Sequence, residues 1–594
     1  MEKKGDSGKD EVFLDPNAFS KDGSTSLTEF GFSQDGSLMA YQLSKNGSDW
    51  TKIVIIKTAD KSQVGDTLMN VKFATVAWKG NEGIFYSAYK RKRGKSSLSE
   101  KTDRHQLYFH KIDTPQLKDE LILGGADYSR RYILSRVSED GRYLIVTAAN
   151  SSSGNELLIK DLTRQSSKFI TVVGNLSGNH EILDIRDRKI FIRTDLQAPN
   201  GKLVATDISN PSVQNWQEII PESQEVLQVT TAGGKIFANY LKDALSSVKQ
   251  FDFTGKLEHQ LKLPDIGSVT AVGIRSKPDD KHLYYYFTSY IHPGTIYKYD
   301  ISSGHSELYK KSNVKFEPDN YVSKHMFYKS KDGTRIPLIV THKKGIKLDG
   351  SNPTLLHGYG GFGVNLTPTF DIRNLLLLEQ GGVLAVANLR GGGEYGVKWH
   401  LAGTKMQKQN TFDDFIAAAD YLIASRYTSP AKLAIAGESN GGLLIGACMT
   451  QRPDLFKVAF PGVAVLDMLR FNKFTGGEGW TFDFGSPEDS RDMFHYLYQY
   501  SPYHSIKPGT VYPATLITTA DHDDRVVPAH SFKFAARLQK SQKGDNPVLL
   551  RVDTKAGHGA GISTAMAIDQ QADKWAFMFH IMGLPYEQNP RQHE

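Results

Sequence analysis

The sequence predicts an all-β propeller over residues 1–314, followed by an α/β domain over residues 315–594. Three observations predict this division. The first half repeats alternating β-branched and aromatic runs behind tight turns, whereas the second half alternates short apolar runs with helical stretches. In the second half a serine, an aspartate and a histidine each follow a predicted strand. With 594 residues, of which 39% are hydrophobic, the chain is long enough to form two large cores.

Six tight turns mark the repeats of the first half. They lie 45, 60, 47, 46 and 46 residues apart, about the length that four short antiparallel strands and their turns occupy. We therefore expect six propeller blades, although a β-sandwich array is a competing fold that strand periodicity alone does not exclude. The turns are Asp35-Gly36, Gly80-Asn81, Asp140-Gly141, Asp187-Arg188, Gly233-Gly234 and Asp279-Asp280.

Charge and cysteine content exclude several function classes. The net charge of +7 is small for this length, and the one basic run, residues 90–95, lacks interleaved aromatic residues, so we interpret it as a solvated hairpin tip. No nucleic-acid partner is predicted. No apolar stretch resembles a signal peptide or a membrane span, and the single cysteine, Cys448, forms no internal disulfide. We therefore expect a cytoplasmic protein without a membrane partner.

The second half has the pattern of a parallel sheet covered by helices. Thr411 is predicted to cap a helix whose Phe412, Phe415, Ala419 and Leu422 share one face. The predicted strands are Leu355-Leu356, Val383 to Ala387, Leu433 to Ala436, Ala514 to Ile517 and Val548 to Leu550.

The segment Gly437-Glu438-Ser439-Asn440-Gly441 joins a predicted strand to a predicted helix, Gly442 to Met449. Such a turn is a nucleophile elbow: small residues flank a serine that projects above the sheet edge, and the helix dipole favours negative charge there. The alternative is a glycine-rich turn with an idle serine. The context favours Ser439 as a nucleophile.

An activated serine needs an imidazole to take its proton and a carboxylate to orient that imidazole. Asp523 and His558 follow the next predicted strands, and the order serine, aspartate, histidine is that of α/β-hydrolases. Because His522 lies among aspartates, a metal site is an alternative, but no further ligands with suitable spacing appear. His558 as a packed histidine is another alternative, although the glycines around it leave little to pack against. No cofactor or metal is predicted.

Acyl transfer also needs donors for an oxyanion. The backbone N–H of Asn440 is one, and the glycine-rich loop of residues 357–363 is the expected source of the second. This loop and Gly391-Gly392-Gly393 resemble phosphate cradles, but neither has the lysine placement of a nucleotide-binding loop.

Nearly the whole chain closely resembles the prolyl oligopeptidase family of propeller-gated serine peptidases. The most specific stretches are residues 358–362, 388–396, 439–444, 521–528 and 553–561. The resemblance implies hydrolysis of short proline-containing peptides on the carboxyl side of proline, with Tyr359 as an oxyanion donor, Arg525 bound to the substrate backbone and Trp480 stacked on the proline ring. It also implies a propeller channel that excludes folded proteins. We further expect a monomer.

The resemblance and the residue chemistry together predict an apolar pocket for proline. Phe362, Val465, Phe484 and Val526 would complete the slot beside Trp480, although core packing is the competing interpretation of the aromatic residues. Two positions depart from the family pattern. Glu438 replaces a usual glycine beside the nucleophile, where it would raise the pKa of His558 or point to solvent, and Phe484 replaces a frequent tyrosine.

The family has an N-terminal segment and seven blades, whereas this chain begins inside what resembles a partial first blade ahead of six complete repeats. We interpret the sequence as a shortened isoform or a fragment, or as a propeller that closes differently. Two other functions remain as alternatives: a related oligopeptidase or esterase of different specificity, and a truncated, weakly active propeller that acts as an interaction module.

Overall fold

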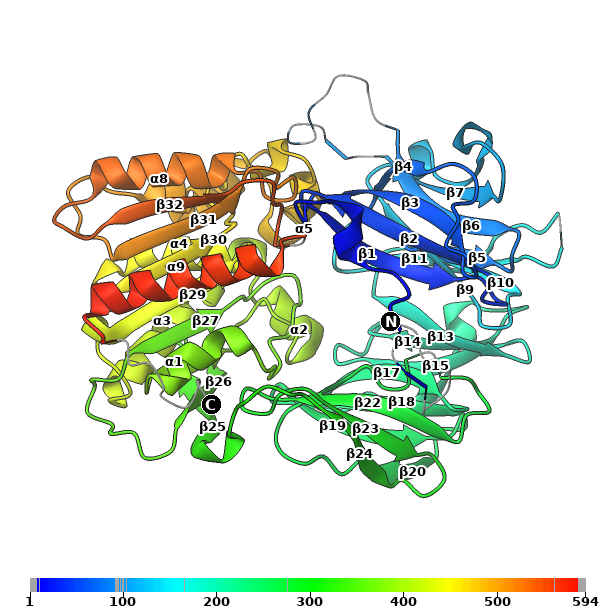
Figure 1. Ribbon diagram of the computed structural model, residues 1–594, viewed down its shortest axis with the longest axis horizontal. Coiled ribbons are helices and arrows are strands. Elements are labelled where there is room, and N and C mark those ends of the chain that lie inside the picture. The colour runs from blue at the N-terminus through cyan, green and yellow to red at the C-terminus, as the bar shows by residue number, and fades with distance from the viewer. Residues whose placement is uncertain are drawn as a thin grey trace.

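The computed structural model describes residues 8–9, 11–90, 96, 98, 101–102, 104–164, 166–274, 276–559 and 561–585. It forms a propeller of antiparallel blades beside an α/β domain (Figure 1). The predicted hairpin tip at residues 90–95 lies almost entirely outside the described residues. No helix in the described ranges has the length and apolar character needed to cross a bilayer.

In the part of the chain that the structure describes, the propeller consists of six groups of four antiparallel strands. The first three groups are β1 (Thr25–Phe32), β2 (Leu38–Lys45), β3 (Trp50–Lys57) and β4 (Leu68–Lys72); β5 (Ala77–Lys79), β6 (Gly83–Tyr89), β7 (His105–Lys111) and β8 (Glu120–Leu123); and β9 (Tyr132–Val137), β10 (Tyr143–Ala149), β11 (Asn155–Asp161) and β12 (Ile170–Val173). The other three are β13 (His180–Arg186), β14 (Lys189–Thr194), β15 (Lys202–Asp207) and β16 (Gln217–Ile220); β17 (Val226–Ala232), β18 (Lys235–Lys242), β19 (Leu245–Phe251) and β20 (Leu257–Gln260); and β21 (Ser268–Thr270), β22 (His282–Thr288), β23 (Thr295–Asp300) and β24 (Ser306–Lys311).

The six predicted turns are confirmed, since each one joins the first and second strands of a blade. Gly36, Gly141 and Gly234 have φ of +75°, +72° and +69°, the left-handed conformation that glycine adopts without a steric penalty. Blades 1 and 2 share one continuous sheet, because β4 pairs with β6. Successive blades pack against each other and follow an arc from β1–β4 to β21–β24 (Figure 1).

The start of the propeller differs from the expectation in one respect. The blade that comes first, β1–β4, has all four strands. Ahead of it the described residues form a short 3-10 helix, η1 (Pro16–Phe19), and they do not form part of a further blade. Phe19 of η1 stacks on Tyr41 of β2, so this segment covers the first blade instead of extending it.

The α/β domain has one eight-stranded sheet in the order β25-β26-β28-β27-β29-β30-β31-β32. The first two pairs are antiparallel and the others are parallel. All five predicted strands are confirmed. The strands are β25 (Tyr321–Lys329), β26 (Arg335–Lys343), β27 (Thr354–Gly358), β28 (Val383–Ala387), β29 (Leu433–Glu438), β30 (Val458–Gly462), β31 (Ala514–Ala520) and β32 (Val548–Asp553).

Helices cover both faces of this sheet. The helices are α1 (Leu375–Glu379), α2 (Gly396–Leu401), α3 (Gln409–Ala424), α4 (Asn440–Gln451), α5 (Thr481–Phe484), α6 (Arg491–Tyr500), α7 (Pro502–Ser505), α8 (Ala529–Ser541) and α9 (Thr564–Met582). Because successive strand residues point to opposite faces, Leu356 packs in the cluster with α3, α4 and α8, whereas Leu355 packs in the cluster with α1 and α9. Parallel strands buried on both faces explain the apolar runs in the sequence.

The predicted cap of α3 is wrong. The helix begins at Gln409, so Thr411 lies inside its first turn. The Thr411 hydroxyl instead donates to the Arg390 carbonyl at 2.8 Å, a tertiary partner that no local pattern indicates. The predicted apolar face is confirmed, because Phe412 and Leu422 are both fully buried against the sheet, as are the other two residues of that face.

Candidate active site

Ser439 lies on a sharp turn between β29 and α4. Its φ of 60° and ψ of −119° are strained for a residue with a side chain, and such strain is typical of a nucleophile elbow. The flanking glycines are required by close packing. A Cβ on Gly437 would lie 2.5 Å from the Gly441 carbonyl oxygen, and a Cβ on Gly441 would lie 3.0 Å from the Gly358 carbonyl oxygen. The local sequence therefore gives the serine its half-buried position at the sheet edge.

Asp523 and His558 follow β31 and β32, two neighbouring parallel strands, and their side chains meet. His558 Nδ1 lies 2.7 Å from Asp523 Oδ2. The other oxygen, Oδ1, accepts the backbone N–H groups of Arg525 and Val526 at 3.1 and 2.8 Å. Because a carboxylate only accepts hydrogen bonds, this contact places the imidazole proton on Nδ1 and leaves Nε2 able to accept a proton.

Tyr359 and Asn440 lie next to the serine. Burial raises the pKa of Tyr359 above its ordinary value, although its contact with Ser439 lowers it, so the phenol keeps its proton and can act as a donor. Asn440 is the first residue of α4, and its side-chain amide donates to the Tyr359 carbonyl at 2.6 Å. The structure thus brings together Ser439 and both residues predicted to supply oxyanion donors.

The five residues of the predicted proline pocket share one apolar cluster. Val465, Phe484 and Val526 are buried in it, and Phe362 and Trp480 pack against it half-buried. The rings of Phe362 and Phe484 meet edge to face at 5.4 Å between centroids. Sequence reasoning missed a further aromatic member, Phe471, which lies parallel to Trp480 at 6.4 Å and edge-on to Phe484 at 5.4 Å.

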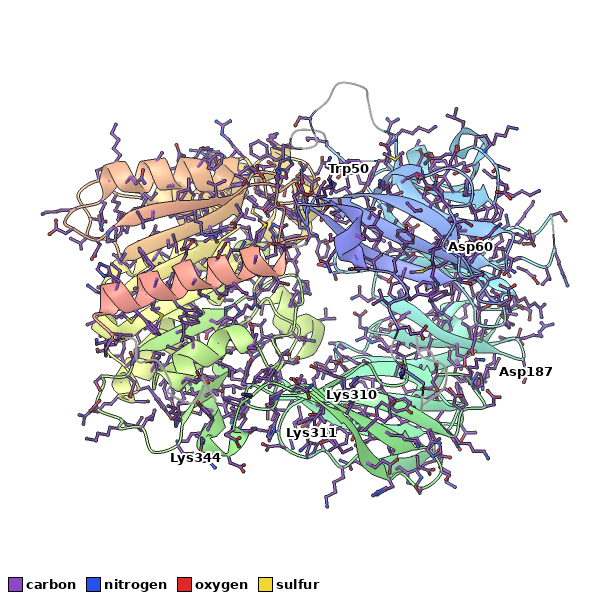
Figure 2. The ribbon with its side chains drawn as sticks, viewed as in Figure 1. Trp50, Asp60, Asp187, Lys310, Lys311 and Lys344 are labelled. Atoms are coloured by element: carbon purple, nitrogen blue, oxygen red, sulfur yellow. The ribbon has the colours of Figure 1, made fainter. Side chains whose placement is uncertain are left out.

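Arg525 binds the propeller in this structure. Its guanidinium makes a bidentate pair with Asp49 of blade 1, with Nε at 3.0 Å and Nη2 at 2.6 Å from the two carboxylate oxygens. Burial alone would raise the pKa of Asp49, but the hydrogen bond and charge of Arg525, together with the charge of Lys72, hold it below its usual range. Figure 2 labels Trp50, the neighbour of Asp49, where blade 1 faces the α/β domain.

Asp524 extends this contact between the domains. Its carboxylate accepts the Ser48 hydroxyl at 2.5 Å and the Asp49 N–H at 2.9 Å. The ammonium of Lys72, which is 1% exposed, lies 3.7 Å from Asp524 and 4.0 Å from Asp49. We call Asp49, Lys72, Asp524 and Arg525 the interdomain charge cluster. Sequence reasoning missed its propeller members, because only the fold brings residues so distant in the chain together.

The turn between β2 and β3 also touches the loop that carries His558. A Cβ on Gly557 would lie 1.8 Å from the Gly47 carbonyl oxygen, and a Cβ on Gly561 would lie 2.9 Å from the Gly47 Cα. Asn46 and Gly47 both have positive φ, at 55° and 67°, which is typical of a tight hairpin turn. Blade 1 therefore contacts the backbone on both sides of the predicted catalytic histidine.

The remaining sequence hypotheses about charged residues have clear outcomes. The aspartates around His522 turn to different partners: Asp521 to His522 at 2.6 Å, Asp523 to His558, and Asp524 to blade 1. This arrangement gives no support to a metal site there. Glu438 is exposed, and it adds to the effect of Asp371 in raising the pKa of Arg373.

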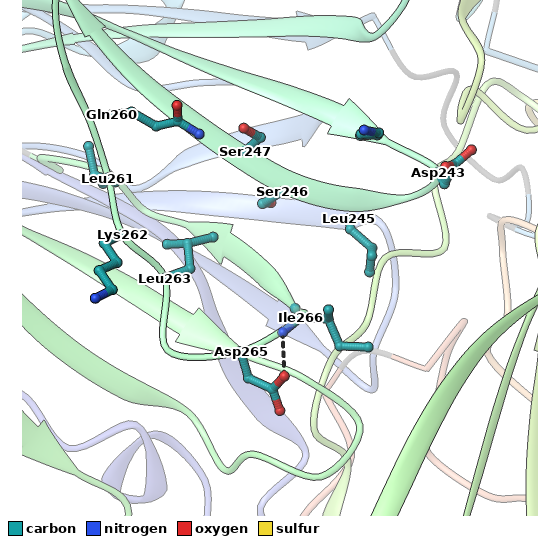
Figure 3. A pocket seen from close by; sticks show the side chains of 12 residues that line it. Asp243, Leu245, Ser246, Ser247, Gln260, Leu261, Lys262, Leu263, Asp265 and Ile266 are labelled. Carbon is teal, nitrogen blue, oxygen red and sulfur yellow. Dashed lines mark hydrogen bonds between the residues drawn. The ribbon is translucent and has the colours of Figure 1, made fainter.

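A cavity of about 470 Å³ lies on blade 5 (Figure 3). It is lined only by propeller residues, among them Leu245, Gln260, Asp265 and Ile266, so it does not include the predicted catalytic side chains. Asp243 at one end of it accepts the Tyr395 hydroxyl at 2.6 Å, which makes a further contact between the propeller and the α/β domain.

An α/β-hydrolase sheet that carries these groups at its carboxyl edge, joined to a β-propeller, defines a propeller-bearing serine hydrolase. Comparisons with known proteins are more specific. Residues 1–312 match the model of the prolyl oligopeptidase N-terminal beta-propeller domain, and residues 368–584 match the model of the prolyl oligopeptidase family. The chain belongs to the prolyl oligopeptidase family.

Relatives and solved structures agree with this assignment. A prolyl endopeptidase of Elizabethkingia miricola is 53% identical over 97% of this chain and 82% of its own length. A dual function macrocyclase-peptidase of Galerina marginata is 33% identical over 98% of this chain and 83% of its own length. A solved prolyl endopeptidase structure superimposes with a TM-score of 0.94 at 38% identity over 98% of this chain and 86% of that chain.

The interdomain charge cluster predicts a measurable effect of Asp49. Asp49→Asn removes the negative charge that pairs with Arg525. We expect the contact between blade 1 and the α/β domain to lose about 2 kcal/mol of free energy. We expect faster hydrogen exchange in residues 46–49 and 555–559, because both segments lie at the contact that the pair stabilises. Asp207→Asn, which breaks the exposed pair with Arg188 in blade 4, is the control. Unchanged exchange in both segments would contradict a stabilising role.

Proposed function

We propose that the serine peptidase activity of this chain, the cleavage of peptides after proline, is carried by Ser439, His558 and Asp523. The observation that carries this proposal is the 2.7 Å contact between His558 and Asp523 at the edge where Ser439 occupies the elbow. Three strand ends at one edge of the sheet thus supply a nucleophile, a base and the group that orients the base, which is the arrangement acyl transfer requires.

The first half of the reaction forms an acyl-enzyme. Ser439 Oγ attacks the carbonyl carbon of the proline residue while its proton moves to His558 Nε2. The carbonyl oxygen becomes an oxyanion, which accepts hydrogen bonds from the Tyr359 hydroxyl and the Asn440 N–H. The carbon–nitrogen bond then breaks, and His558 gives its proton to the departing amine.

The second half releases the acid. Water gives a proton to His558 and attacks the acyl carbon, so a second oxyanion forms against the same two donors. Ser439 then leaves and takes back the proton from His558. Asp523 keeps the imidazole in one tautomer throughout and stabilises its charged form without itself being protonated.

The preference for proline is assigned to the apolar cluster beside the serine. The Trp480 indole would stack on the flat pyrrolidine ring, with Phe362, Val465, Phe484 and Val526 around it. A charged side chain would lose its hydration in this slot without gaining a partner. Arg525 is assigned to the substrate backbone, and it would have to exchange its contact with Asp49 for the peptide.

Short proline-containing peptides are the proposed substrates, because the propeller lies beside the loops that carry His558 and Tyr395 and restricts approach from that side. A monomer is proposed as the working unit, since every group in the proposed mechanism comes from one chain. A cytoplasmic location is proposed from the single cysteine, Cys448, which is buried.

Substrate preference tests the proposal. We expect peptides with proline before the scissile bond to be cleaved at least ~10²-fold more efficiently than matched peptides with arginine or phenylalanine there. The measurement is kcat/KM for three chromogenic peptides that differ only at this position. A preference for arginine would replace the proline assignment with that of a related oligopeptidase, and the triad assignment would be unaffected.

A further inference from the structure

The loop that carries Tyr359 is held by side chains from three separate helical segments. Residues 359–363 follow β27, and three of their backbone groups hydrogen-bond side chains instead of a neighbouring strand. The contacts are the Asn440 amide to the Tyr359 carbonyl at 2.6 Å, the Lys408 ammonium to the Gly360 carbonyl at 2.7 Å, and the Phe362 N–H to the Asp483 carboxylate at 2.5 Å. Asn440 belongs to α4, Lys408 directly precedes α3, and Asp483 lies in α5.

This loop needs such support because its backbone is strained. Gly360 has φ of +62°, which glycine adopts freely, but Phe362 has φ of +57°, which is costly for a residue with a side chain. Such a conformation persists only where the surroundings determine it. The contact from Asp483 is made to the N–H of the strained residue itself.

The supporting charges are fully buried, which is costly in a protein interior. Lys408 is 1% exposed and Asp483 is 0% exposed. Burial lowers the pKa of Lys408 to about 8, and the charge of Asp483 opposes that effect. His400, which is also buried, lies with Nε2 at 2.8 Å from the second oxygen of Asp483. If these side chains only filled space behind the loop, apolar residues would do so without the desolvation free energy that buried charges cost.

We propose that Lys408 and Asp483 are positioning residues for Tyr359: they fix the loop of residues 359–363 so that the phenol stays at Ser439. Lys408 determines the direction of the peptide between Gly360 and Gly361, and Asp483 fixes the strained residue Phe362. His400 orients Asp483. The proposal rests on the role of Tyr359 as an oxyanion donor, and it adds two buried charged residues that act through Tyr359 without touching substrate.

A double-mutant cycle tests whether Lys408 acts through Tyr359. Lys408→Met keeps most of the side-chain volume and removes the donor and the charge. We expect it to lower kcat for a proline peptide by about 10- to 100-fold, with KM changed less than about 3-fold, because displaced oxyanion donors weaken the transition state more than the bound substrate. In a Tyr359→Phe background the same change should lower kcat less than about 3-fold further.

A matched variant separates positioning from general stability. Lys432 also donates from its ammonium to one backbone carbonyl, that of Met582 at 2.6 Å, but this carbonyl lies at the end of α9, away from the Tyr359 loop. Lys432→Met should leave kcat within about 3-fold of wild type. Asp483→Asn provides an independent variant if Lys408→Met does not fold, and it should show the same non-additivity with Tyr359→Phe.

The outcomes are distinct. Loss of kcat that is absent in the Tyr359→Phe background supports the proposal. Equal losses in both backgrounds would overturn it, as would an unchanged kcat in folded Lys408→Met. A wild-type rate for Tyr359→Phe alone would overturn both this proposal and the oxyanion role, whereas the assignment of the nucleophile would still stand on Ser439→Ala.

Discussion

Ser439→Ala is expected to lower kcat/KM for a proline-blocked chromogenic peptide by at least ~10³-fold. The substitution removes the protein atom that bonds to the substrate carbonyl carbon in the proposed mechanism. The residual rate would come from direct attack by water, with the oxyanion donors stabilising the intermediate. Alanine fits the elbow, because it adds no atom beyond the Cβ that serine already has. The fold should therefore be retained, which circular dichroism and thermal unfolding would check.

The control for this substitution is Ser505→Ala. Ser505 lies in α7, and its hydroxyl donates to the Gln499 carbonyl at 3.1 Å, so it shares the residue type and the domain but not the elbow. Its rate should stay within about 3-fold of wild type. An active-site fluorophosphonate should label wild type and Ser505→Ala and fail to label Ser439→Ala. Equal peptide hydrolysis by all three proteins would refute the nucleophile assignment.

Asp523→Asn is expected to lower kcat by ~10⁴-fold with little change in KM. The two backbone N–H groups of Arg525 and Val526 would hold the amide oxygen at the Oδ1 position, so the amide NH₂ would face His558 Nδ1. An NH₂ donor requires Nδ1 as an acceptor, which moves the imidazole proton to Nε2. In that tautomer His558 cannot accept the proton of Ser439.

The control is Asp521→Asn, which changes the same residue type two positions earlier. Asp521 pairs with His522 on an exposed turn and accepts the Lys555 N–H at 2.8 Å. We expect its kcat to fall less than about 5-fold. Steady-state kinetics on both variants gives the comparison, and comparable losses would show that His558 does not depend on a specific carboxylate partner.

Features that depend on neighbouring residues were predictable from the sequence. The turn Asp35-Gly36 and its five counterparts were identified because residues such as glycine and aspartate favour tight turns through their own local conformation. The elbow around Ser439 was identified for the same reason, since the close approach of Gly437 and Gly441 restricts which residues fit there. The convergence of Ser439, Asp523 and His558 then followed from the rule that parallel strands end at one edge.

Features that depend on tertiary contacts were not predictable in this way. Asp49 has an ordinary surface composition around it, and only the fold places it against Arg525, which lies 476 positions away in the chain. Lys408 and Asp483 belong to unremarkable helical segments, and their burial arises because both approach the Tyr359 loop from different sides. Thr411 failed as a cap for the same kind of reason, since Arg390 offered its hydroxyl a tertiary acceptor.

The direct backbone contact between Gly47 and Gly557 has a consequence for protein engineering. The two main chains meet where Gly557 has no room for a Cβ, so the loop that carries His558 rests directly on one propeller hairpin. A chimera that combines this hydrolase with a foreign propeller would need to carry the hairpin of residues 45–50 along with it. In a graft that omitted this hairpin, we expect both domains to fold but the His558 imidazole to be misplaced.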